Sequence, residues 1–190
     1  MSQITLSHFA NFSSSVPWGL WVAVYVWLVG ISCGAYFLAM LANGRNSQGL
    51  KKITDLAIAL SLAALCAGLL SILADLGHIE RFFKLFLNPS FSSVMAWMVW
   101  LYNIYFAVLL VSLFRVKKGF AKSFAYISAL FALGLLFVES LLFALPPGKA
   151  WHSLIFPIHF VFSSIAAASG ILIFLSTILI QKAKEYSDSV

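Results

Sequence analysis

The sequence predicts an all-α protein, a polytopic membrane helix bundle of about five transmembrane helices with its N-terminus outside. Three observations support this: an apolar composition, five long apolar segments, and basic residues concentrated on one side. Of the 190 residues 62% are hydrophobic and only 9% are charged, whereas a soluble domain has about 25% charged residues. A soluble fold is therefore excluded, and the net charge of +6 reflects membrane orientation rather than nucleic-acid binding.

Five apolar segments are each long enough to cross about 30 Å of hydrocarbon. They span residues 18–43, 53–77, 91–115, 122–145 and 153–181. Pro17 suits the first turn of a helix, and Gly148 after two prolines separates the fourth segment from the fifth. We expect residues 1–190 to form a single membrane domain, a four-helix bundle plus one further helix.

The basic residues give the orientation. Nine of them lie between the first and second segments, between the third and fourth, or in the tail: Arg45, Lys51, Lys52, Arg115, Lys117, Lys118, Lys122, Lys182 and Lys184. The opposite side has only Arg81, Lys84 and Lys149. Because cytoplasmic loops accumulate Lys and Arg, the N-terminus and the loop from Asp75 to Lys84 are expected outside.

Small residues at helical spacing predict where the helices pack closely. They occur in the first segment (Gly30, Gly34), the second (Ala64, Gly68, Ser71) and the fifth (Ser163, Ala167, Gly170).

The loop after the second segment is unusually polar for this protein. Asp75 lies on the last turn of the predicted helix, and His78, Glu80 and Arg81 follow it. A carboxylate at the membrane edge beside His and Arg is a candidate place for proton and electron chemistry. Arg81 either extends to lipid headgroups and pairs with Glu80, or keeps Asp75 ionised and in position. These two roles are compatible.

A polar layer is also predicted in the outer half of the membrane. At about 1.5 Å per residue, one polar or amphipathic side chain from each of four segments lies roughly 9–10 Å deep: Tyr25, Trp97, Glu139 and His159. Ser71 lies at a similar depth in the second segment. No ionisable layer is expected in the inner half, which argues against a channel or carrier.

Glu139 is the most informative residue of this layer. An ionised carboxylate in hydrocarbon is costly, so it is either neutral and bonded to a neighbouring helix or a proton acceptor beside a redox ligand. His152 and His159 either bond backbone carbonyls freed around Pro157 or take part in function. Their proximity to Glu139 and Asp75 favours the functional interpretation.

The sequence resembles the family of NrfD-type integral membrane subunits, which includes the membrane subunit of polysulfide reductase. The residues that resemble the family signature are Asp75-Leu76-Gly77, Arg81-Phe82, Asn88-Pro89, Ser92 or Ser93, Met95, Trp97 and Trp100. Those that resemble the start of its fifth helix are Trp151-His152, Pro157, Phe160, Ser163 and Gly170. The resemblance covers the first five helices, which is nearly the whole chain.

This resemblance implies a quinone-interacting membrane anchor without haem or metal, in the bacterial inner (cytoplasmic) membrane. It implies that menaquinone or ubiquinone binds near the outer (periplasmic) face, within the first four-helix bundle. The implied partners are an iron–sulfur (ferredoxin-like) subunit on that face and a molybdopterin catalytic subunit. The protein would then be the quinone-reactive subunit of a multisubunit respiratory oxidoreductase rather than an enzyme alone.

Two departures from the family are visible. Family members have eight or more spanning helices, so this sequence is expected to be either partial or a short form. A tyrosine of the family's fourth helix is replaced near Phe137, with Glu139 beside it. This replacement moves the expected quinone contact from a tyrosine to Glu139.

The predicted site is therefore a quinone pocket in the outer half of the bundle, walled by Trp97 and Phe137. An apolar aromatic slot with a few polar groups suits a quinone. Asp75 and Glu139 are the candidate catalytic residues, which exchange protons. The candidate quinone-binding residues are His78, Arg81, Trp97, Phe137, His152, His159 and Tyr25.

Two alternatives stay open. The first is a b-type haem membrane anchor, which needs two facing histidines; only His159 lies well inside an apolar segment, with His78 nearer its edge. The second is a non-redox membrane scaffold or transporter fragment. Cys33 and Cys66 form no CxxC pair, so a cysteine-ligated cluster or an attached haem is not expected.

Overall fold

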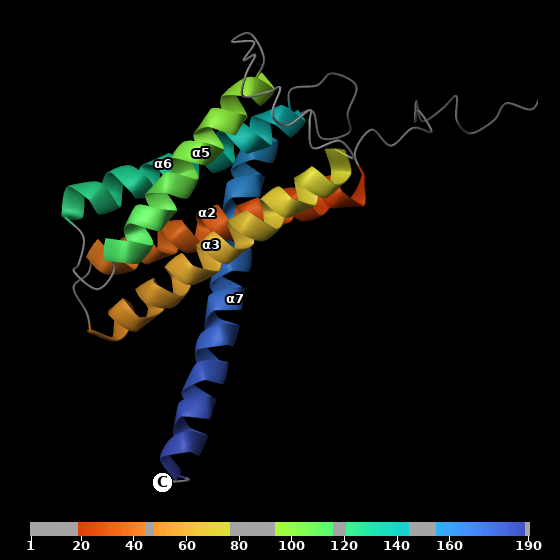
Figure 1. Ribbon diagram of the computed structural model, residues 1–190. Helices are drawn as coiled ribbons and strands as arrows, with labels where there is room; N and C mark the ends of the chain where they lie inside the picture. Colours follow the sequence, from red (N-terminus) through yellow and green to blue (C-terminus); the bar gives the residue numbers. More distant parts are fainter. Residues whose placement is uncertain (1–18, 45–47, 77–93, 116–120, 145–154, 189–190) are drawn as a thin grey trace, which may run out of the picture.

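Five α-helices make up the computed structural model, which describes residues 19–44, 48–76, 94–115, 121–144 and 155–188 (Figure 1). The helices are α2 (Leu20–Gly44), α3 (Gln48–Leu76), α5 (Val94–Arg115), α6 (Lys122–Ala144) and α7 (Ile155–Asp188). Within these ranges there is no β-strand. The predicted all-α class is confirmed, and all five helices are long and apolar enough to span a membrane.

Two helices are longer than the apolar segments predicted. α3 begins at Gln48 rather than at residue 53, and α7 continues past residue 181 to Asp188. Their apolar parts, Ile53–Ala74 and Ile155–Gln181, agree with the prediction. Lys, Gln and Glu are good helix formers, so a helix continues through them after the membrane-spanning part has ended. The length of the apolar segment therefore sets the length of the membrane-spanning part, whereas the helix itself can continue beyond it.

The core of the bundle is built around α2. This helix contacts α3, α6 and α7, while α5 completes the bundle against α3 and α6. Figure 1 shows α7 crossing α2 and α3, with its C-terminal part extending beyond the other helices. All five predicted helices are therefore present, and α7 packs directly on α2 and α6.

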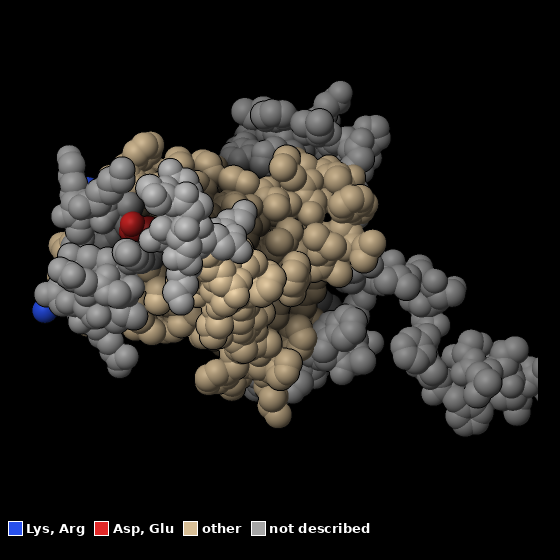
Figure 2. All heavy atoms as spheres, turned by 90° about the horizontal axis from the view of Figure 1, so that it is seen from below, with Lys and Arg blue, Asp and Glu red and all other residues tan. Residues whose placement is uncertain are grey.

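Side chains of α2 fill the centre of this arrangement. The fully buried ones include Val29, Cys33, Ala35, Tyr36 and Ala39. The outer surface is apolar too, and in the view of Figure 2 the described atoms are nearly all uncharged, with the few coloured spheres at one end. Large exposed apolar side chains suit contact with lipid, where the exterior is as apolar as the core.

Glycines bring α2 and α7 into close contact. A Cβ atom added to Gly34 would lie 2.7 Å from the backbone oxygen of Ser164 and 3.0 Å from the Cβ of Ala168. At Gly30 it would lie 2.7 Å from the Ser164 Oγ. Because lipid gives no hydrophobic driving force between helices, such close van der Waals packing holds them together.

The predicted packing positions are confirmed in α2 and α3 but wrong in α7. Gly68 of α3 contacts Leu28, and Ala64 and Ser71 are buried. In α7, however, Ser163 is exposed and a Cβ at Gly170 would have no atom within 4 Å. The neighbours of α2 are Ser164 and Ala168, one position further along. A shift of one residue rotates a position by about 100° around the helix axis. The spacing of small residues shows that they share one helix face, but it does not show which face contacts the neighbouring helix.

Gly34→Ala is expected to lower the stability of the protein by about 1–3 kcal/mol, because the added methyl group meets backbone rather than a flexible side chain. Gly134→Ala is the matched control, since a Cβ there would have nothing within 4 Å. That control should be neutral or stabilising by up to about 1 kcal/mol, because Ala is the better helix former. Thermal unfolding of both variants in detergent measures the difference, and equal stabilities would contradict the packing of α2 on α7.

Candidate functional site

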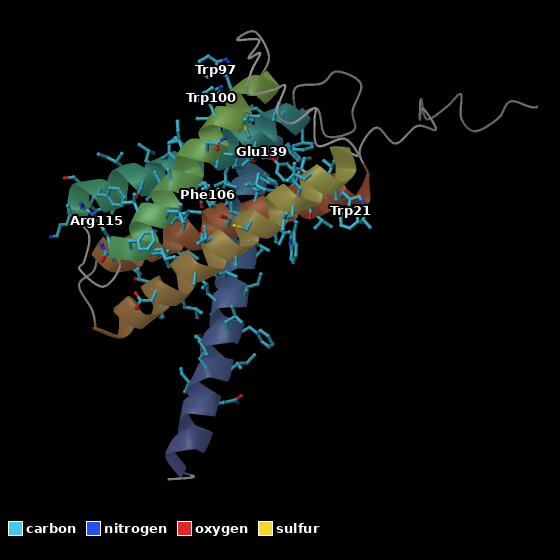
Figure 3. The ribbon with its side chains drawn as sticks, in the orientation of Figure 1. Trp21, Trp97, Trp100, Phe106, Arg115 and Glu139 are labelled. Atoms are coloured by element: carbon cyan, nitrogen blue, oxygen red, sulfur yellow. The ribbon has the colours of Figure 1, made fainter. Side chains whose placement is uncertain are left out.

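Glu139 lies at the centre of the bundle. It is fully buried on α6, on the same helix face as the buried residues Ala132, Leu135 and Leu136. This face packs against α2, with α5 alongside. Figure 3 shows Glu139 among side chains of several helices rather than at the surface. The predicted carboxylate within the hydrocarbon region is therefore also a core residue.

Two tyrosines connect Glu139 to the neighbouring helices. The hydroxyl of Tyr102 on α5 donates a hydrogen bond of 2.6 Å to Oε2 of Glu139. The hydroxyl of Tyr25 on α2 donates one of 2.8 Å to the hydroxyl oxygen of Tyr102. The two rings meet edge to face, with centroids 6.0 Å apart. Tyr25, Tyr102 and Glu139, here named the outer cluster, thus join three helices by one hydrogen-bonded chain.

The direction of these bonds favours negative charge on Glu139. A tyrosine has one hydroxyl proton, so the proton of Tyr102 goes to the carboxylate while its oxygen accepts from Tyr25. Hydrogen bonds to an ionised acceptor are short and strong, which agrees with the 2.6 Å distance. The two tyrosines therefore compensate in part for the cost of burying a carboxylate.

The second carboxylate oxygen of Glu139 differs from the first in its hydrogen bonding. Oε1 of Glu139 is buried and has no hydrogen-bond partner among the described residues. A buried oxygen without a partner is rare in folded proteins, because no hydrogen bond offsets the free-energy cost of removing it from water. Oε1 is therefore the atom at which a proton or an external hydrogen-bond donor would be received.

A second group of hydroxyls lies on α2, α3 and α5. Ser32 Oγ of α2 and Ser61 Oγ of α3 each donate to the other's backbone oxygen at 2.8 Å. The Tyr105 hydroxyl of α5 lies 3.1 Å from Ser61 Oγ and 3.3 Å from Ser32 Oγ. Because both serine protons are used by backbone oxygens, Tyr105 is the donor to a serine. Ser32, Ser61 and Tyr105 are named the middle cluster.

A third group, the inner cluster, consists of Tyr36 on α2 and Ser112 on α5. Their hydroxyl oxygens are 2.8 Å apart, and Ser112 also donates to the Val108 backbone oxygen at 2.8 Å. Tyr36 is therefore the donor to Ser112. The expected absence of an ionisable layer from the inner half concerned charged side chains alone. Buried hydroxyl groups nevertheless continue further into the bundle.

Of the predicted site residues, the structure brings Tyr25 and Glu139 together. Trp97 and Phe137 are about half exposed, at 51% and 45%, and His159 is exposed on α7. Figure 3 shows Trp97 at the end of α5, away from Glu139. These three residues are thus on the outside of the helices, and their contact with a quinone stays a prediction.

The remaining predicted residues belong to the membrane edge. Asp75 falls in the last turn of α3, as predicted, while His78, Arg81 and His152 lie outside the described residues. Within the described part of the protein, no three His, Cys, Asp or Glu side chains form a group that could hold a metal ion.

Sequence reasoning missed Tyr102, the direct partner of Glu139. The resemblance to the family indicated that a tyrosine is replaced near Phe137, on the same helix as Glu139, whereas in the structure a tyrosine from α5 contacts Glu139. A signal was available, since Tyr102 and Tyr105 lie three residues apart inside an apolar span and thus on one helix face. What was missing was the pairing of α5 with α6.

Comparison with known proteins supports the family. The family model described as "Polysulphide reductase, NrfD" matches residues 9–190. A selenate reductase subunit of Mesobacillus selenatarsenatis is 31% identical over 118 residues, which are 62% of this chain and 27% of that protein. The Hdr-like menaquinol oxidoreductase integral membrane subunit of Archaeoglobus fulgidus is 26% identical over 169 residues, covering 86% and 42% respectively.

A polysulfide reductase polypeptide of Wolinella succinogenes is 33% identical over 108 residues, which are 55% of this chain and 34% of that protein. The matched sequence thus spans less than half the length of these relatives. No solved structure matches it. Because the family model covers nearly all of its residues, and five of its helices can span a membrane, this chain is a multi-pass membrane protein that belongs to the NrfD family.

Proposed function

We propose that this protein is the quinone- or quinol-binding integral membrane subunit of a respiratory oxidoreductase complex, with the outer cluster as its proton-exchanging group. The observation that carries the proposal is the buried Glu139 carboxylate, which accepts a hydrogen bond on Oε2 and is unpartnered on Oε1 among the described residues. A carboxylate kept in apolar surroundings with one open oxygen is suited to general acid–base chemistry.

A bound quinone would supply two-electron redox chemistry coupled to two protons. The residues near Glu139 fit such a ligand, since they are aromatic and aliphatic with few polar groups. Glu139 would take up or release a proton at Oε1. Tyr102 and Tyr25 would stabilise the ionised form, because both hydroxyl protons point along the hydrogen-bonded chain toward Oε2.

Several finer parts of the proposal rest on the relatives. One is named a menaquinol oxidoreductase subunit, and others are named as parts of selenate and polysulfide reductases. These names favour menaquinone and a position within a reductase complex. We further propose an iron–sulfur partner on the periplasmic face, a molybdopterin catalytic subunit beyond it, and a place in the bacterial inner membrane.

The membrane-edge residues have a supporting role in this proposal. Asp75 at the end of α3, with His78 and Arg81 after it, would lie between the quinone and the iron–sulfur partner. Placing residues from the ends of several helices around one ligand is typical of sites within helix bundles.

Glu139→Gln is expected to lower quinol-dependent electron transfer to the partner subunit by roughly 10²- to 10⁴-fold, the usual contribution of a general acid or base. The side chain keeps its shape but can no longer exchange a proton. Asp55→Asn is the matched control, because Asp55 is an exposed carboxylate near the other end of the bundle. Steady-state quinol oxidation by the purified complex measures the effect. Undiminished turnover in Glu139→Gln would remove this residue from the mechanism.

Tyr102→Phe is expected to slow the same reaction by roughly ten- to a hundredfold, because it deletes one hydrogen bond to a charged group. Tyr126→Phe serves as the control, since Tyr126 on α6 is exposed. A loss shared by both variants, or by neither, would argue against a specific role of the outer cluster.

A further inference from the structure

α5 is joined to α2 in a different way from α7. α7 reaches the glycines of α2, whereas α5 contains no glycine and its backbone packs more on α3 and α6 than on α2. Three hydroxyl groups of α5 instead form hydrogen bonds with neighbouring helices: those of Tyr102, Tyr105 and Ser112. The placement of α5 against α2 therefore depends on directional hydrogen bonds more than on close contact between backbones.

The bond between Tyr102 and Glu139 requires a particular rotation of α5. The Tyr102 hydroxyl donates to Oε2 of Glu139 on α6 at 2.6 Å and accepts from Tyr25 on α2 at 2.8 Å. A hydrogen bond weakens steeply as it becomes longer and less linear. Because the three side chains belong to three helices, a turn of α5 about its axis would lengthen at least one of these two bonds.

The middle cluster supplies a constraint on that rotation, one helical turn away from Tyr102. Tyr105 lies three residues after Tyr102 on the same face of α5, about 4.5 Å further along the helix. Its hydroxyl is 3.1 Å from Ser61 Oγ and 3.3 Å from Ser32 Oγ. Ser32 and Ser61 in turn bond each other's backbone oxygens at 2.8 Å, which fastens α2 to α3. Tyr105 therefore ties α5 to a pair of helices that are already joined.

The hydroxyl of Tyr105 has little freedom to change partners, because Tyr105, Ser32 and Ser61 are all fully buried. A buried polar group that loses its partner is destabilised, which opposes any rotation of α5 that would carry this hydroxyl away from the two serines. The Tyr105 ring also meets the ring of Tyr36 edge to face, with centroids 5.9 Å apart. A change of Tyr105 to phenylalanine keeps this ring contact and so isolates the hydrogen bond.

We propose that Tyr105, through its bond to Ser61, is a positioning residue for Tyr102. It holds α5 at the rotation at which the Tyr102 hydroxyl meets Oε2 of Glu139. The effect passes through the backbone of α5, and no proton travels between the clusters. The consequence for catalysis rests on the proposed function, in which a correctly placed Tyr102 supports proton exchange at Glu139.

The test measures the hydrogen bond at Glu139 directly, by infrared spectroscopy of the full-length protein in lipid nanodiscs at acidic pH. The carboxylic C=O band of Glu139 is assigned by its absence in Glu139→Gln. A hydrogen bond to a carbonyl oxygen lowers its stretching frequency, so Tyr102→Phe should move the band to higher frequency and calibrates the measurement. If the carboxyl group stays ionised, the same comparison is made on its antisymmetric carboxylate band. No quinol is present, so failure of this test is separate from failure of the proposed function.

Tyr105→Phe and Ser61→Ala are expected to move the band in the same direction as Tyr102→Phe, because each weakens the constraint on α5. Tyr36→Phe is the matched control, and its band should stay in place. This change also removes a buried tyrosine–serine bond between α2 and α5, but at Ser112, about 15 Å along the helix from Tyr102. The double variant Tyr102→Phe with Tyr105→Phe should match Tyr102→Phe alone, since residues that act through one bond are not additive.

Three outcomes would overturn the proposal. The first is a band that both Tyr105→Phe and Ser61→Ala leave in place. The second is an equal shift in Tyr36→Phe, which would show a general loosening of the bundle instead of a specific effect on Tyr102. The third is a larger shift in the double variant than in Tyr102→Phe, because Tyr105 would then act on Glu139 by a route other than Tyr102.

Discussion

The hydrogen bond from Tyr102 to Glu139 is the interaction on which the centre of this bundle depends. A carboxylate is costly to bury in a bundle whose surface faces lipid. Here the cost is reduced by a short bond to Oε2 and by a second tyrosine that supports the first. The three side chains come from α2, α5 and α6, so the same bonds that stabilise the charge also fix the relative positions of three helices.

That arrangement is possible only because α2 can occupy the middle of the molecule. Its glycines allow α7 to approach on one side, and Gly68 of α3 lies against it on another. Close backbone packing then directs the larger side chains of α2, including Tyr25 and Tyr36, toward α5. Helix packing and the polar chemistry of the core are thus two consequences of the same small residues.

The distribution of polar groups distinguishes this core from that of an ordinary helix bundle. Helices in lipid associate through close packing and occasional hydrogen bonds. In this protein several interhelical hydrogen bonds join α2 to α3 and α5, and a further one joins Tyr102 of α5 to Glu139 of α6, whose second oxygen has no partner among the described residues. A buried oxygen without a hydrogen-bond partner calls for an explanation such as a functional role. Proton exchange is the role that we propose, since a buried carboxylate can bind and release a proton.

The sequence by itself determined the class, the number of spanning helices, the positions of their apolar parts and the presence of a carboxylate, Glu139, within one of them. These follow from composition and from the cost of charge in hydrocarbon, which act locally and can be read along the sequence. Only the tertiary structure decided which side chains meet. It placed Tyr102 beside the carboxylate, Ser164 rather than Ser163 against α2, and buried hydroxyls at several levels of the bundle rather than in a single polar layer. Such choices depend on the rotation of each helix about its axis and on which helices pair. Both are set by packing between residues far apart in sequence, which periodicity alone does not specify.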